Sequence, residues 1–148
     1  MARFRAGWRT AGAGTATLPM ASMYSLGTGE IWVVEIHVTN TTTTPFECSV
    51  KRVTTAGGQG AAQTMVYGEG PNNNTAKGDP RDTHTVTAPT LVAGEICRTS
   101  IGAAVGNGII WTFGSRDLII PSGTTNGIAL MPITGTGQIA DVTWVIDQ

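Results

Sequence analysis

Short runs of alternating apolar and polar residues, separated by turn residues, constrain the fold of this chain more than any other feature. Glu30–Thr39 carries an apolar residue at every second position, and Phe46–Val53 repeats the pattern after a Thr-rich turn. Alternation of period two is typical of a strand that buries one face. The apolar face of the first run holds Trp32, Val34, Ile36 and Val38. We expect the two runs to pair as a hairpin.

The last third of the chain repeats this pattern in further short segments. Strands are expected in Ile109–Phe113, Asp117–Ile120, Gly127–Ile133 and Ile139–Ile146. Many strands at spacings of roughly 8–12 residues predict an all-β sandwich or barrel. Apolar residues at helical spacing do not persist, and only Leu91–Ala104 suggests a single turn of helix.

Length and composition predict one ordered domain over residues 1–148. The chain is 41% hydrophobic but only 13% charged, and its net charge is −1. Chains of this size bury enough surface for a core without disulfides or metals. The weak charge argues against nucleic acid or an anionic membrane as a partner. No apolar run is long enough for a signal peptide or a membrane span, so we expect assembly in the cytoplasm without export.

Two segments stand out as candidate contact elements. Residues 1–14 begin with three arginines and two aromatic residues in nine positions, which suits an arm that docks on a partner. An edge strand with solvated arginines is the alternative. Residues 54–82 form an unusually long polar stretch, and loops of this length are often functional. The candidate partner contacts are Arg3, Arg5, Trp8, Arg9, Asn72, Asn73, Asn74, Lys77 and Arg81.

Residues able to support catalysis or metal binding are sparse and scattered. His37 and His84 lack neighbours at metal-ligand spacing, so both are expected at the surface or at an interface. Cys48 and Cys97 lie in separate strand-like runs without a C-x-x-C motif, and we expect free buried thiols rather than a disulfide. No catalytic, metal or cofactor site is therefore predicted. The three tryptophans expected in the core are Trp32, Trp111 and Trp144.

A family resemblance appears in the C-terminal half. The segments Val105–Gly114, Leu118–Gly127 and Gly137–Asp147 resemble small virion proteins of tailed bacteriophages that decorate or cement the head. The resemblance implies an antiparallel β-sandwich of jelly-roll type that forms homotrimers. It also implies binding to the major capsid protein on the head surface, acting by contact and without catalysis.

Two other classes of function share this fold. A receptor- or carbohydrate-binding domain of a phage tail or fibre would expose aromatic residues in its loops, yet the long polar stretch and Gly102–Gly108 contain only Tyr67. A cupin-like β-barrel enzyme would need clustered histidine and carboxylate ligands, and the chain has two histidines in all.

Overall fold

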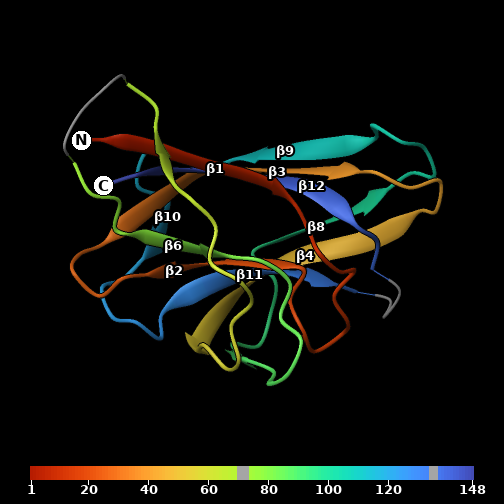
Figure 1. Cartoon of the computed structure of the whole chain (residues 1–148), viewed down its shortest axis with the longest axis horizontal. Coiled ribbons are helices and arrows are strands. Elements are labelled where there is room, and N and C mark those ends of the chain that lie inside the picture. Colours follow the sequence, from red (N-terminus) through yellow and green to blue (C-terminus); the bar gives the residue numbers. More distant parts are fainter. Residues whose placement is uncertain (70–73, 134–136) are drawn as a thin grey trace.

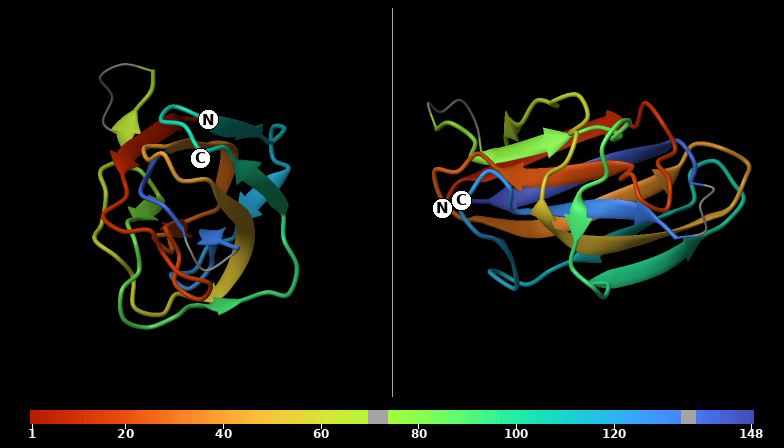
Figure 2. Two further views of the ribbon diagram at one scale, coloured as in Figure 1. Left: turned by 90° about the vertical axis from the view of Figure 1, so that its right-hand side faces the viewer. Right: turned by 90° about the horizontal axis from the view of Figure 1, so that it is seen from below.

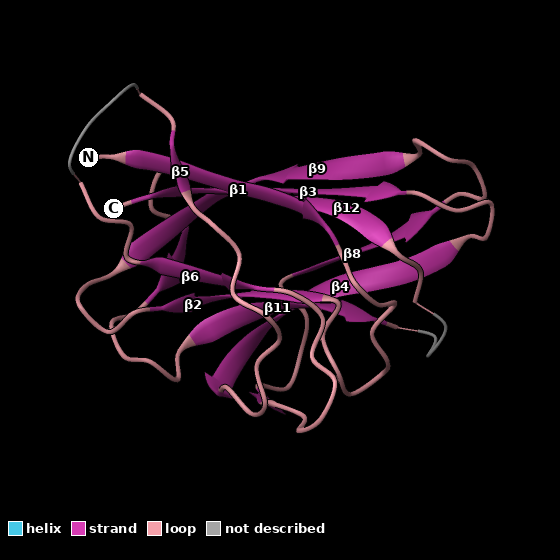
Figure 3. Ribbon diagram, in the orientation of Figure 1, coloured by secondary structure: helices cyan, strands magenta, loops and turns pink. Residues whose placement is uncertain are grey.

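The fold consists of two antiparallel sheets packed face to face (Figures 1 and 3). The computed structural model describes residues 1–69, 74–133 and 137–148, and these ranges contain strands but no helix. None of the described residues therefore belongs to a helix that could cross a membrane. The sandwich confirms the expected fold class. The helical turn expected in Leu91–Ala104 is wrong, because this range holds a strand and tight turns.

Each sheet has six strands. Sheet A contains β1 (Arg3–Arg9), β3 (Ile31–Asn40), β5 (Val66–Tyr67), β9 (Gly108–Thr112), β10 (Leu118–Ile120) and β12 (Ala140–Asp147). Sheet B contains β2 (Ala21–Ser25), β4 (Phe46–Thr55), β6 (Gly78–Arg81), β7 (Thr90–Leu91), β8 (Cys97–Ile101) and β11 (Gly127–Pro132).

Strand pairing is nested, with early strands joined to late ones. In sheet A, β1 pairs with β12, and β3 lies between β12 and the successive strands β9 and β10. In sheet B, β2 pairs with β11, and β4 lies between β11 and the successive strands β7 and β8. A long hairpin folded over on itself in this way is the topology of a jelly roll. The short strands β5 and β6 extend the sheets at β1 and β2.

β3 and β4, which follow one another in the chain and both alternate apolar and polar residues, face one another across the core and do not pair. The expected hairpin of Glu30–Thr39 with Phe46–Val53 is wrong, because β3 belongs to sheet A and β4 to sheet B. Both strands bury alternate residues against the same core from opposite sides, which produces the pattern of a hairpin. The connection is shaped by Asn40, whose side chain donates to the carbonyls of Thr44 and Gly102.

A β-bulge in β3 changes which tryptophan reaches the core. Val145 of β12 lies opposite Glu35, but the next residue lies opposite Val33, so Val34 is extra. An extra residue reverses the alternation on either side of a bulge. Trp32 consequently lies on the outer side of sheet A, against expectation. The other two are placed as expected, since Trp144 is fully buried and Trp111 is half-buried against the core.

The long polar stretch covers the outer side of sheet B. Tyr24, Val53, Ala129 and Met131 point away from the main core and form a second apolar cluster with Ala56 and Leu91. Residues 57–63 run beside residues 80–88 to make this cover, as the paths below sheet B in Figure 1 and the views in Figure 2 show. A Cβ at Gly60 would lie 2.2 Å from the carbonyl oxygen of Asp82, so only glycine fits there.

Candidate interaction surface

The outer side of sheet A is largely uncovered, although Val145 and Asp147 on it are buried, whereas residues 57–63 and 80–88 cover part of the outer side of sheet B. No described segment lies across the outer side of sheet A, and its residues come from four neighbouring strands in register. We call it the open face. It is formed by Arg3, Arg5, Gly7 and Arg9 of β1, Asp141, Thr143, Val145 and Asp147 of β12, Trp32, Glu35, His37 and Thr39 of β3, and Gly108, Ile110 and Thr112 of β9.

The expected N-terminal arm is part of this face. Arg3–Arg9 pairs along its whole length with β12 and is a strand of the sheet, so a free arm is wrong and the edge-strand alternative is closer. Its period-two alternation, with Phe4 and Ala6 buried, made it a strand. The three arginines consequently project from the open face.

Two of these arginines are held by carboxylates of β12. Arg3 Nε lies 2.8 Å from Asp147 Oδ1, and Arg9 Nε lies 2.8 Å from Asp141 Oδ1. In each pair a second nitrogen of the guanidinium also donates to the carboxylate, which makes the contact bidentate. The hydrogen bonds from Arg9 lower the pKa of Asp141 below its usual value. Arg5 is exposed, and no carboxylate of the described residues pairs with it.

Trp32 adds an aromatic surface to the open face. The guanidinium carbon of Arg116 lies 5.0 Å from the centre of the Trp32 ring, a cation–π contact. Arg116 has a φ of +71°, in the left-handed region that non-glycine residues seldom adopt. Farther along β3, Glu35 and His37 form a hydrogen-bonded pair at 2.8 Å. His37 is thus a surface histidine, as expected.

Trp8 and Arg81, two further predicted contacts, are used within the fold. Trp8 packs against the core, and its indole N–H donates to Asp82 Oδ1. The same oxygen accepts the backbone N–H of Ala11 and of Thr83, so Asp82 ties the N-terminal segment to the cover. Arg81 lies in β6, where two of its nitrogens donate to Asp79 Oδ2.

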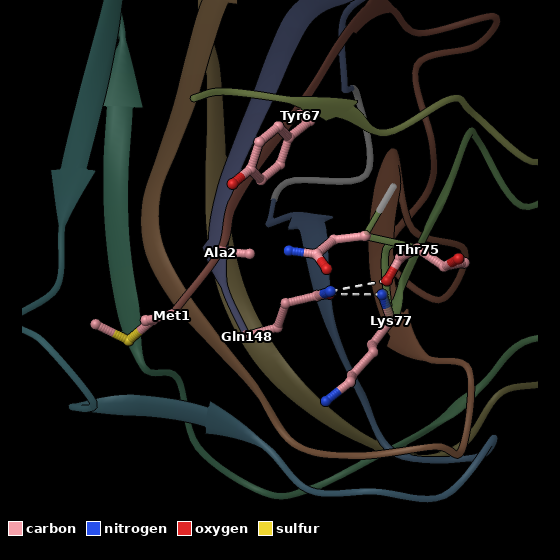
Figure 4. A pocket seen from close by; sticks show the side chains of 7 residues that line it. Met1, Ala2, Tyr67, Thr75, Lys77 and Gln148 are labelled. Atoms are coloured by element: carbon pink, nitrogen blue, oxygen red, sulfur yellow. Dashed lines mark hydrogen bonds between the residues drawn. The ribbon is translucent and has the colours of Figure 1, made fainter. Parts of the chain in front are cut away.

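The remaining described candidates gather beside the two chain termini (Figure 4). Asn74 and Lys77 line a shallow pocket of about 290 Å³ together with Tyr67 and Gln148. Gln148 closes one side, because its amide accepts from Lys77 N at 2.6 Å and donates to Thr75 O at 2.8 Å. The other lining residues are Met1, Ala2 and Thr75. The predicted contacts Asn72 and Asn73 lie outside the described residues.

His84 is buried, which corrects the expectation of a surface or interface histidine. It lies beneath the cover of sheet B, where Nε2 is 2.8 Å from Ser22 Oγ and the ring is 6.2 Å from that of Tyr24. Nδ1 is buried without a hydrogen-bond partner among the described residues. Burial lowers the pKa of His84, and the nearby positive charge of Arg81 lowers it further. The surface position predicted for His84 is wrong because the polar stretch around this residue folds over sheet B and turns its side chain inward.

Both cysteines are free thiols. Cys97 lies opposite Val50, two residues from Cys48, so the two are diagonal neighbours on adjacent strands. Diagonal side chains lie roughly 7–8 Å apart, which is too far for a disulfide without backbone movement. Burial raises the pKa of Cys48 to about 12 and that of Cys97 to about 11.

Comparisons with other proteins add no identification. Neither the models of known protein families nor the curated proteins include a match to this chain. Within the described ranges, no three His, Cys, Asp or Glu side chains are grouped closely enough to hold a metal ion. The open face, the pocket at the termini and the strand edges are surface features of the described residues that could bind a partner. Sequence reasoning missed Trp32 as a surface residue, because the bulge that turns it to the outer side of sheet A has no signal in the sequence.

Proposed function

We propose that this chain is a structural protein of a tailed-phage particle that binds the outer surface of the capsid and stabilises the head. It acts through contacts with the major capsid protein and with its own copies, as a homotrimer and without catalysis. The resemblance of the C-terminal half to decoration proteins suggested this function. The jelly-roll sandwich is compatible with it.

The observation that carries the proposal is the asymmetry of the sandwich. Residues 57–63 and 80–88 of the chain cover part of the outer side of sheet B, whereas the open face presents a broad sheet surface with few free charges. A broad sheet face suits extended contact with another protein surface, such as a capsid shell. Binding there adds buried interface to the folded and assembled state, which stabilises the shell by mass action.

The test places the same large charged side chain on and off the open face. Thr143→Arg puts it in the middle of the face, on a central strand whose side chain at this position points away from the core. Ser100→Arg, on exposed β8 of sheet B, is the matched control. We expect Thr143→Arg to reduce co-sedimentation with DNA-free heads at least about tenfold, as a loss of 1.4 kcal/mol in binding would. The control should bind as the unmodified protein does. Equal binding by both variants would remove the open face from the proposal.

A receptor- or carbohydrate-binding tail domain is the second candidate, and Trp32 is the observation in its favour. The half-buried indole of Trp32 could stack on the apolar face of a sugar ring if Arg116, which lies over the ring, moved aside. Quenching of tryptophan fluorescence by a glycan, abolished in Trp32→Ala, would support this candidate. Retention on glycans by a protein that ignores phage heads would replace the first proposal with it.

A further inference from the structure

The free edge of β9 is the starting point. β9 pairs with β3 on one side, and no described strand pairs with it on the other. It lies at the outer border of sheet A, as Figures 1 and 2 show. An edge strand presents unpaired N–H and C=O groups that can pair with another chain.

The register with β3 fixes which backbone groups face outward. Just beyond the two ends of β9, Asn40 N donates to Asn107 O at 2.7 Å and Phe113 N donates to Val34 O at 2.8 Å. In an antiparallel pair the residues alternate between facing the partner and facing away. The residues between these two bonds whose backbone groups face away from β3 are Gly108, Ile110 and Thr112.

Five other strands at the sheet edges are short or carry features that discourage pairing, and β9 does not. β6 contains Pro80, which lacks an N–H, and β8 contains the charged Arg98. At β10, Arg52 Nη1 donates to the carbonyl oxygen of Ile119 at 2.7 Å and thereby caps it. β5 and β7 have only two residues each. β9 has five residues, none of them charged and none a proline. Natural sheets seldom leave such an edge uncovered.

We infer that β9 pairs antiparallel with β9 of a second copy, about a two-fold axis that passes through Ile110. In this register the outward groups of Ile110 meet those of the second copy's Ile110. The groups of Gly108 meet those of the second copy's Thr112, and the groups of Thr112 meet those of the second copy's Gly108. All outward donors and acceptors are then paired, in about six hydrogen bonds. A two-fold contact requires such self-complementarity.

The side chains of β9 suit the same register. Ile110 is 58% exposed and lies at the axis, so two isoleucines become direct cross-strand neighbours on the open face. On the inner side, Ile109 lies opposite the second copy's Trp111, and a β-branched residue beside an aromatic one is a favourable cross-strand pair. Gly108 lies opposite the second copy's Thr112, and only glycine fits there because a Cβ would meet the carbonyl oxygen of Val38 in β3.

This contact goes beyond the proposed function and does not depend on it. It is two-fold, whereas the trimer implied by the resemblance closes through three heterologous contacts. The two associations therefore differ in mass and in symmetry. The test uses the isolated protein, without phage heads, so its failure leaves the capsid proposal standing.

The experiment combines a backbone substitution with a cross-link. Ile110→Pro removes one outward N–H without removing a bond to β3, so the fold should persist. We expect sedimentation to show two-fold association of the unmodified protein at concentrations up to about 1 mM and its loss in Ile110→Pro. Ile110→Cys should form a disulfide-linked dimer on mild oxidation, since residues that exchange both hydrogen bonds have Cα atoms about 5.5 Å apart.

The matched control is Val86→Cys, because Val86 is 83% exposed but lies in the cover of sheet B. It should cross-link far more slowly than Ile110→Cys under the same conditions. Circular dichroism and thermal melting establish that each variant is folded. An unmodified protein that stays monomeric, or an association that Ile110→Pro leaves unchanged, would overturn the inference.

Discussion

Acidification should destabilise this protein through His84, the histidine beneath the cover of sheet B. Its side chain is 1% exposed, and the groups around it are Ser22, Tyr24 and the positive Arg81. Burial disfavours the charged imidazolium, so the pKa of His84 in the folded protein lies below its value in the unfolded chain, which is about 6.5. Asp82, two residues toward the N-terminus, directs Oδ1 to Trp8, Ala11 and Thr83.

The sign of the effect follows from proton linkage. Between the folded pKa and about pH 6.5, the unfolded chain binds a proton at His84 that the folded protein does not. The free energy of unfolding therefore falls as the pH falls through this window, by at most about 1.4 kcal/mol per pH unit. Above about pH 7 the contribution is complete and independent of pH.

Urea unfolding at several pH values between about 5 and 8 measures this slope. His84→Gln should abolish the part of the slope due to this residue, because glutamine does not titrate. His37→Gln is the control, since His37 lies half-buried on the open face beside Glu35. We expect this control to retain the His84 slope. If His84→Gln loses stability with acid as steeply as the unmodified protein, the assignment of the acid sensitivity to the buried ring is wrong.

Three further substitutions or reactions test the packing of the sandwich. Gly127→Ala should lower the free energy of unfolding by about 1–3 kcal/mol, because the new Cβ would lie 2.4 Å from Tyr24 Cδ1. Urea unfolding measures this loss, and an unchanged midpoint would contradict the packing of the Tyr24 ring. Asp82→Ala should cost about 3 kcal/mol by leaving buried donors unpaired, and Asp82→Asn, which keeps an acceptor oxygen, should cost less in the same assay. Cys48 and Cys97 should resist a disulfide reagent at pH 8 in the folded protein and react together on unfolding, because burial raises the pKa of each thiol. A rapid reaction of one equivalent in the folded state would contradict this protection.

Several strands could be predicted from local pattern, but β2 and β6 were not, and the partners of the predicted strands could not be predicted. The alternation in Phe46–Val53 and Ile139–Ile146 corresponds to β4 and β12, because each buries alternate residues in one core. Alternation records that a face is buried but not which strand lies beside it. For this reason β3 and β4 were expected to pair, although they face one another across the sandwich.

The errors at individual residues have local physical causes. Trp32 was expected inside because strict alternation cannot reveal the extra residue at Val34. His84 was expected outside because its neighbours are polar, yet those neighbours satisfy their hydrogen bonds within a cover that buries it. The N-terminal arginines were recognised as surface residues, but pairing of β1 with β12 holds them on a sheet rather than on a free arm.

The mass of the protein in solution, measured by light scattering with and without DNA-free heads of a tailed phage, tests the proposed capsid binding most directly. The account predicts an oligomer that co-sediments with the heads and raises their melting temperature. A protein that leaves the sedimentation and the melting of the heads unchanged would contradict it.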